Sequence, residues 1–137
     1  MGFKSSQSAV WKLANSSDVL TDLSAYVDSV DPSWEIENAD VTTLGQAGRR
    51  NLNLLENHTI TVTYVYDRTA WTHNTGIWGA SVSVKAFELH REGTASTTPK
   101  ESGNLRLTKI SPPVKVGTVM QFTCTYKVDG VINFGTN

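Results

Sequence analysis

The sequence predicts a mainly β protein, a sandwich or barrel with one short helix. Three segments, residues 57–67, 80–89 and 119–128, alternate apolar and polar side chains with the period of a strand. Signals for helix are few, and turn residues such as Asp129-Gly130 bound the alternating segments. With 137 residues, 39% of them hydrophobic, the chain can bury a core, and we expect a single domain over residues 1–137.

Residues 57–67 carry the strongest strand signal. Their apolar side chains share one face and their threonines share the other, which is typical of a strand that packs one face on a core. The apolar set is Ile60, Val62, Tyr64 and Tyr66, and the polar set is Thr59, Thr61 and Thr63. Residues 119–128 repeat the pattern with Met120, Phe122, Cys124, Tyr126 and Val128 in phase.

In residues 80–89 the alternation changes phase. Ala80, Val82, Val84 and Ala86 form the apolar set, and Ser81, Ser83 and Lys85 form the polar set. Phe87 and Leu89 then break the phase, which indicates a bulge or a twist near the strand end. Weaker strands are expected at Val10–Ala14, Tyr26–Val30 and Leu105–Ile110, and loops at Thr69–Gly79 and Glu92–Gly103.

One segment, "DVTTLGQAGRR" at residues 40–50, differs from the strands that the sequence predicts on both sides of it. Thr43 and Gln46 fit a capping box, and Asp40 just upstream favours a helix N-terminus. Gly45 and Gly48 each weaken a helix by roughly 1 kcal/mol relative to alanine. The expected helix is therefore only one or two turns long.

Composition excludes several classes of function. A net charge of -1 argues against a dedicated nucleic-acid binder, and a single cysteine excludes an intrachain disulfide. The chain has no apolar run of membrane-spanning length. His58, His73 and His90 lack metal-ligand spacing and are expected at the surface, whereas Cys124 is expected to be a buried thiol. With no catalytic motif either, we expect neither an enzyme nor a cofactor nor a metal site.

Two further groups of residues leave alternatives open. Trp71 and Trp78 flank an expected loop, where aromatic side chains could stack on sugar rings as in a carbohydrate-binding β-sandwich. The favoured alternative is that the tryptophans close the core or an oligomer interface. A loose acidic cluster could form a paired-carboxylate site, but a solvated acidic strip is favoured. Its members are Asp28, Asp31, Glu35, Glu37 and Asp40.

The order of these segments carries a resemblance. Asp22-Leu23-Ser24 precedes Tyr26-Val27, then Asp40-Val41-Thr42-Thr43 precedes Gly45 and Arg49 or Arg50, and an alternating strand follows over residues 59–67. Near the end, Gly117 leads into a final strand closed by Asp129-Gly130. Over residues 18–67 and 112–135 the chain resembles the tail tube proteins, or major tail proteins, of long-tailed bacteriophages.

The resemblance implies a tail-tube-like fold, hexameric rings that stack into a tube, and passage of double-stranded genomic DNA through that tube into the host. It also implies contacts with the tape measure, terminator and baseplate proteins, synthesis in the host bacterial cytoplasm and a final location in the virion tail. The threonine faces of the strands would suit a polar lumen. A tail terminator, a baseplate hub domain or a capsid decoration protein is the nearest alternative.

Under the resemblance to tail tube proteins, the segment at residues 40–50 is interpreted as a connector between subunits. The two glycines permit close backbone approach, and the arginines would pair with a neighbour's acidic strip. The expected interface residues are Asp40, Thr42, Thr43, Gly45, Gln46, Gly48, Arg49 and Arg50.

Overall fold

The computed structural model describes residues 9–40, 51–79, 84–112, 114, 117 and 119–137. The described residues form ten strands, one α-helix and a short 3₁₀ turn over Ser24–Tyr26. In chain order the elements are β1 (Val10–Ala14), β2 (Leu20–Asp22), β3 (Val27–Ser33), β4 (Ile36–Asp40), β5 (Asn51–Glu56), β6 (Thr59–Val65), α1 (Arg68–Gly76), β7 (Lys85–His90), β8 (Pro99–Ser111), β9 (Gln121–Val128) and β10 (Asn133–Thr136). The predicted mainly β class is confirmed.

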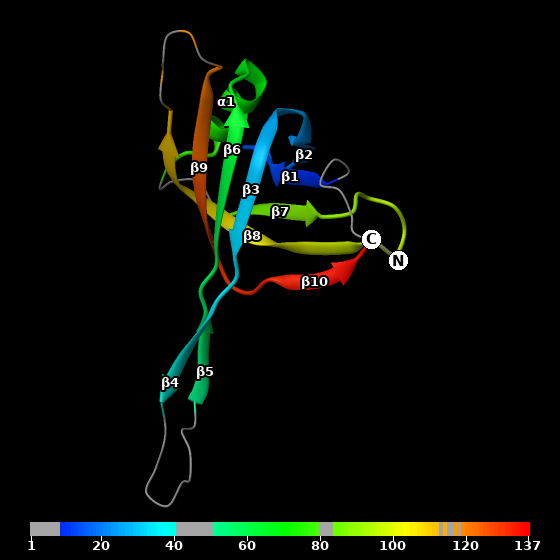
Figure 1. Cartoon of the computed structure of the whole chain (residues 1–137), viewed down its shortest axis with the longest axis vertical. Coiled ribbons are helices and arrows are strands. Elements are labelled where there is room, and N and C mark those ends of the chain that lie inside the picture. The colour runs from blue at the N-terminus through cyan, green and yellow to red at the C-terminus, as the bar shows by residue number, and fades with distance from the viewer. Residues whose placement is uncertain (1–8, 41–50, 80–83, 113, 115–116, 118) are drawn as a thin grey trace, which may run out of the picture.

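Eight strands form one antiparallel sheet in the order β2-β1-β7-β8-β9-β6-β3, with β10 also pairing with β8. In Figure 1, β3, β6 and β9 run roughly at right angles to β1, β7 and β10, and the long strand β8 bends from one direction to the other. The sheet therefore folds over on itself. Trp11 of β1 lies 6.0 Å from Tyr126 of β9, ring centre to ring centre, so the two halves enclose the core as in an orthogonal sandwich.

A chain of buried polar groups crosses this core. The indole N–H of Trp11 donates to the hydroxyl of Tyr64 at 3.0 Å, and the hydroxyl of Tyr64 lies 2.8 Å from that of Tyr126. Tyr126 in turn donates to the amide oxygen of Asn74 on α1. Buried polar atoms are costly unless they are paired, so this chain fixes the helix against the sheet.

Helix α1 corrects one prediction, because residues 69–79 were expected to be a loop. Asp67 caps the helix by accepting the backbone N–H of Thr69 at 2.8 Å. Its inward stripe contains only Ala70, Asn74 and Ile77, two of them apolar, with Trp71 beside them. So sparse a stripe produces little helical periodicity in the sequence.

Strand β7 corrects the predicted phase. Lys85, Phe87 and Leu89 are buried and Ala86 is exposed, so the inward set joins Lys85, predicted as polar, to the two residues predicted to break the phase. The Lys85 ammonium lies 2.8 Å from the carboxylate of Asp18, which compensates its charge. Residues 80–83 lie outside the described residues.

The other predicted strands are confirmed, with some changes in their bounds. Strands β1, β6 and β9 match the expected segments, although Met120 precedes β9 and is exposed. Strand β3 continues to Ser33, past Pro32, which an edge strand tolerates. Strand β8 begins at Pro99, so the expected loop at residues 92–103 is wrong for its last five residues.

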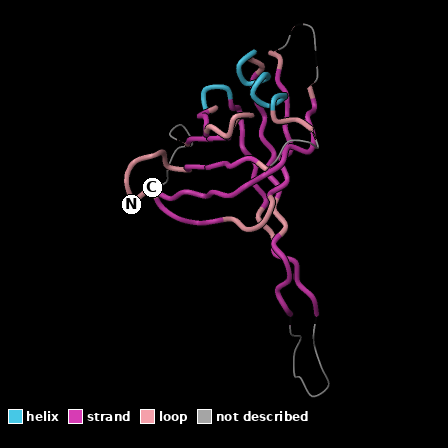
Figure 2. The backbone as a smooth tube through the Cα atoms, turned by 180° about the vertical axis from the view of Figure 1, so that it is seen from behind, coloured by secondary structure: helices cyan, strands magenta, loops and turns pink. Residues whose placement is uncertain are grey.

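Strands β4 and β5 form a separate hairpin that projects from the main sheet (Figures 1 and 2). Neither was predicted as a separate strand, because the strands expected before and after residues 40–50 were residues 26–30 and 57–67. Strand β3 leads into β4, and β5 leads back into β6, so the hairpin is a direct extension of two neighbouring strands. We call the crossing point, residues 34–35 and 56–58, the neck.

Candidate assembly surfaces

The outward face of β3, β6, β9 and the second half of β8 is rich in hydroxyl groups. The inward side chains are buried in β6 and β9 and partly buried in β3 and the second half of β8, so their sequence neighbours point outward. The strand registers align the outward side chains in three rows across four strands. The rows are Ser33-Thr59-Lys127-Arg106, Asp31-Thr61-Thr125-Lys109 and Ser29-Thr63-Thr123-Ser111. We call these twelve residues the hydroxyl face.

Eight of the twelve side chains carry a hydroxyl and four carry a charge. The hydroxyl oxygens of Thr63 and Thr123 lie 3.3 Å apart across the strands. The charges, three positive and one negative, occupy the two rows nearer the neck, and the third row is uncharged. The face is therefore hydrated and nearly neutral at one end, with no catalytic pairing of acid and base visible in its rows.

Both sides of this four-stranded half are open in the described part of the chain. Strand β3 pairs only with β6, and residues 107–111 of β8 pair only with β9. Unpaired strand edges expose backbone N–H and C=O groups that readily pair with another chain. The geometry therefore allows copies to join edge to edge with their hydroxyl faces on one side.

Apolar side chains are exposed near both ends of the molecule. On the hairpin, Ile36 is 48% and Leu55 78% exposed. Beyond the opposite ends of β8 and β9, Val114 and Val119 are 79% and 71% exposed. Large apolar side chains are also exposed at Val19, Val131 and Phe134, so those on the hairpin and beyond β8 and β9 are candidate contact positions rather than a continuous patch.

The predicted interface segment is described only at its first residue. Asp40 ends β4 and pairs with Asn51 of β5, which places the start of the segment at the far end of the hairpin (Figure 1). The other seven residues, Thr42, Thr43, Gly45, Gln46, Gly48, Arg49 and Arg50, lie outside the described residues, as does the helical turn predicted there. Their interface role stays a prediction.

The acidic residues do not gather into a site. Asp28 and Asp31 lie on β3, Glu35 lies in the neck and Glu37 lies on β4, all of them exposed. Within the described residues, no group of three or more His, Cys, Asp and Glu side chains could hold a metal ion.

The tryptophans serve mainly the core. Trp11 is buried, and Trp71 lies on α1 with its ring against Phe122 at 5.2 Å rather than on a loop. Trp78 is 51% exposed. The pair of loop tryptophans that a sugar-binding surface would need is therefore not present in the expected form.

Surface positions were expected for all three histidines, and the prediction is wrong for two of them, which are buried. His58 and His90 are 3% and 1% exposed, whereas His73 on α1 is partly buried. Burial lowers the pKa of His73, although its contact with the carbonyl of Ala14 acts in the opposite direction. The expected burial of Cys124 is confirmed.

His58 holds the neck together. Its Nδ1 accepts the backbone N–H of Glu35 at 3.0 Å, and its Nε2 lies 2.7 Å from the carboxylate of Glu56. The backbone N–H of Asn57 donates to the carbonyl of Glu35 at 2.8 Å. The two contacts with Glu35 join residues more than twenty positions apart, so no local sequence pattern indicates them.

Comparison with known proteins identifies solved structures that share this architecture. No protein-family model and no curated protein matches the sequence. Among solved structures, a chain from the virion of a native gene transfer agent particle superposes with a TM-score of 0.78 at 15% identity, covering 97% of this chain and 99% of that chain. The chain has a tail-tube-like fold.

Two more solved structures share the tail-tube-like fold. A chain from the tail of an empty gene transfer agent particle with C6 symmetry has a TM-score of 0.73 at 16% identity, covering 97% of this chain and 99% of that one. A chain from the sheath-tube complex of an extracellular contractile injection system, PVC, in its extended state has a TM-score of 0.71 at 11% identity, covering 98% and 93%. The resemblance inferred from the sequence is thus confirmed at the level of the fold.

The sequence indicated only part of the hydroxyl face. The threonines of β6 and β9 follow from strict alternation, but the contribution of β8 does not. Its register shifts between Leu107 and Lys109, and the hydroxyl of the intervening Thr108 donates to the carbonyl of Thr125 at 3.0 Å. A bulge of this kind hides the alternation from a period-two pattern.

Among the described residues, no helix combines the length and hydropathy needed to cross a bilayer.

Proposed function

We propose that this chain is a structural subunit of a tail tube, in which hexameric rings stack and the tube conducts double-stranded DNA into a bacterial host. The observation that carries the proposal is the hydroxyl face on a four-stranded antiparallel half whose two edges are open. The tail-tube-like fold supports it, as does the C6 symmetry of the tail in which one similar chain occurs.

The open edges would form the ring. The edge of β3 in one copy pairs with residues 107–111 of β8 in the next, and this heterologous contact closes by rotation. Six copies of a four-stranded half make a barrel of roughly 24 strands, more than the 16 to 18 strands of porins, which already enclose an aqueous channel. The edges that would favour aggregation in a monomer are paired in such a ring.

The hydroxyl face would line the channel. Lys and Arg contacts with phosphates account for much of the affinity of proteins for DNA, so a conduit functions best when such contacts are few. Eight hydroxyl groups offer neutral hydrogen bonds that water replaces easily, and Asp31 offsets part of the charge of Lys109, Lys127 and Arg106. DNA would then pass without tight binding.

The hairpin would connect one ring to the next. It carries exposed Ile36 and Leu55 away from the main sheet and ends in the segment at residues 40–50. The interface residues proposed there are Asp40, Thr42, Thr43, Gly45, Gln46, Gly48, Arg49 and Arg50. The tape measure protein would occupy the lumen during assembly, and the terminator and baseplate proteins would bind the two ends of the tube in the virion.

Electron microscopy of the purified protein tests the proposal. We expect rings or tubes with sixfold symmetry in negative stain, because the open edges require partners. A protein that stays strictly monomeric at high concentration, even with tail initiator proteins supplied, contradicts it. Mass spectrometry of virions separates a tube subunit from a terminator, hub or decoration protein, since a tube subunit is among the most abundant proteins of the particle.

A further inference from the structure

The contacts of His58 define its protonation state. A ring nitrogen that accepts a hydrogen bond carries no proton, so acceptance of the Glu35 N–H by Nδ1 places the single ring proton on Nε2. Nε2 then donates to the Glu56 carboxylate. An imidazolium has a proton on both nitrogens and cannot accept at Nδ1. Protonated His58 must therefore release the backbone N–H of Glu35, whatever happens to its contact with Glu56.

Trp34, on the other side of the neck from His58, attaches the neck to the main sheet. The ring of Trp34 meets that of His58 edge-on at 5.5 Å, and its indole N–H donates to Glu101 of β8 at 2.7 Å. Arg91 binds the same carboxylate through Nε at 2.5 Å and through a terminal nitrogen at 3.1 Å. This hydrogen bonding raises the pKa of Arg91.

Several elements that carry charged groups pack around His58. The carboxylate of Glu56 also lies 3.5 Å from the backbone N–H of Ile132, which ties β5 to the segment before β10. The backbone N–H of Val128 donates to the carbonyl of His58 at 3.1 Å, which ties β9 to the neck. The charged residues at or next to the neck contacts are Glu56 on β5, Glu35 between β3 and β4, Glu101 with Arg91, and Lys127 with Asp129 at the end of β9. Farther along the same elements are Asp28 and Asp31 on β3, Glu37 on β4, and Lys100, Arg106 and Lys109 on β8.

We propose that His58 is a proton-sensitive hinge for the β4–β5 hairpin. When neutral, His58 joins β5–β6 to the start of β4 and fixes the direction in which the hairpin leaves the main sheet. When protonated, it releases the Glu35 N–H, so that of the two contacts with Glu35 only the Asn57–Glu35 backbone hydrogen bond remains, and the hairpin is held less firmly in its direction. This inference rests on the proposed ring-to-ring role of the hairpin, and under that role acidification weakens stacking of rings.

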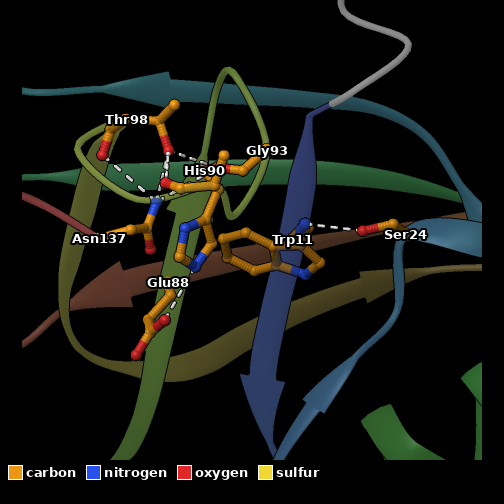
Figure 3. Close-up of polar contacts among 8 residues, drawn as sticks. Trp11, Ser24, Glu88, His90, Gly93, Thr98 and Asn137 are labelled. Carbon is orange, nitrogen blue, oxygen red and sulfur yellow. Dashed lines mark hydrogen bonds and ion pairs between the residues drawn. The ribbon is translucent and has the colours of Figure 1, made fainter.

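His90 provides a matched comparison within the same chain. It is also buried, and its Nε2 lies 2.8 Å from the carboxylate of Glu88, two residues earlier, as Glu56 is to His58. However, its Nδ1 has no hydrogen-bond partner among the described residues. Figure 3 shows its ring near Trp11 on β1, in the part of the molecule where Asn137 binds Thr98 and Gly93. Protonation of His90 breaks no backbone contact of the neck.

Hydrogen exchange of the full-length, unassembled protein tests the hinge directly. Histidines change charge between about pH 8 and pH 5. Over that range we expect the protection factor of the Glu35 amide to fall about tenfold, and more than that of β6 amides. In His58→Gln, whose side chain can accept and donate but not titrate, protection should not change with pH. In His90→Gln the wild-type pH dependence should remain.

Several outcomes overturn the hinge. It is wrong if Glu35 protection in the wild type does not depend on pH, or if His58→Gln keeps the wild-type dependence. If His58→Gln does not fold, Glu56→Gln serves instead. Loss of the carboxylate disfavours the imidazolium, so the transition should move to lower pH, and an unchanged midpoint contradicts the proposal.

Tube yield then separates this inference from the proposed function. Tubes that form at neutral pH and dissociate in acid in the wild type, but persist in His58→Gln, support both. If neither the stability of the tubes nor the protection of the Glu35 amide depends on pH, the hinge is contradicted and the proposed tube function is not affected. A protein that never forms tubes contradicts the proposed function, while the exchange measurement on unassembled protein still decides the hinge.

Discussion

The hydroxyl of Tyr126 lies 2.8 Å from the hydroxyl of Tyr64 and donates its proton to Asn74, so a single side chain of β9 joins β6 to the helix. Since Tyr126 donates to Asn74, the hydroxyl of Tyr64 donates to Tyr126 and accepts from Trp11. Each hydroxyl hydrogen in this chain has one acceptor. This chain of hydrogen bonds joins both halves of the sheet to α1, and every residue in it is buried.

Tyr126→Phe should destabilise the protein without reshaping its core. The change leaves the buried oxygen of Asn74 unsatisfied and removes an acceptor from Tyr64, at a cost of about 1–3 kcal/mol. The free energy of unfolding in urea measures the effect. Tyr66→Phe, at a 41% exposed ring, is the control and should change stability by less than about 0.5 kcal/mol. Equal effects of the two substitutions would show that the buried network contributes nothing.

Alkaline pH should destabilise the protein through Cys124. Burial raises the pKa of its thiol to about 12, whereas an unfolded thiol has a pKa of about 8.5. Between these values the folded state binds more protons, so the free energy of unfolding falls as pH rises, by up to about 1.4 kcal/mol per pH unit for one thiol.

Urea titrations between about pH 8 and pH 10 test this linkage, and because the unfolded tyrosines, with a pKa of about 10, titrate equally in wild type and variant, the comparison isolates the thiol. Cys124→Ala should flatten the decline over that interval, even though its cavity lowers stability at every pH. The slope is therefore the informative quantity. Above about pH 10 the buried tyrosines Tyr64 and Tyr126, whose pKa values burial also raises, add a decline of the same sign in both proteins. Identical slopes for wild type and variant below pH 10 would refute the assignment.

Most of the fold was accessible from the sequence because β6 and β9 each pack one face on the core. The wrong predictions occur where packing does not follow a repeating pattern. Lys85 is buried because Asp18, 67 residues away in sequence, compensates its charge. The first half of β8 was missed because its pairing with β7 and β10 depends on backbone hydrogen bonds rather than alternating side chains. Both are long-range effects that local periodicity does not encode.

The candidate site was predictable to a smaller extent. The threonines of β6 and β9 are visible as a polar face, but their alignment with Asp31 and Lys109 depends on the register of four strands. The contacts of His58 were invisible for the same reason. A histidine two residues after a glutamate is ordinary at a surface, and only the crossing of β3–β4 with β5–β6 buries it.

Charge reversal at the segment of residues 40–50 should impair assembly more than folding. Arg49→Glu and Arg50→Glu place a negative charge where the proposed neighbour offers an acidic strip, and such like-charge contacts oppose association. Sedimented tube yield should fall severalfold while the melting temperature of the monomer stays within a few degrees. Arg68→Glu, at an exposed position on α1 away from the hairpin, is the matched control. Unchanged tube yield from both substitutions would remove these arginines from the interface.

Cations added to the hydroxyl face should make the tube retain DNA. Thr61 and Thr125 face each other at the centre of that face, so Thr61→Lys places a charge within the proposed lumen without touching the strand edges. Tubes of the variant should bind short duplex DNA measurably at low salt, with a slope of log affinity against log salt of about −0.9 for each phosphate neutralised. Fluorescence anisotropy with wild-type tubes should show little binding. Thr72→Lys, at an exposed position on α1, adds the same charge elsewhere. DNA binding that rises equally in both variants would argue that the hydroxyl face does not line the channel.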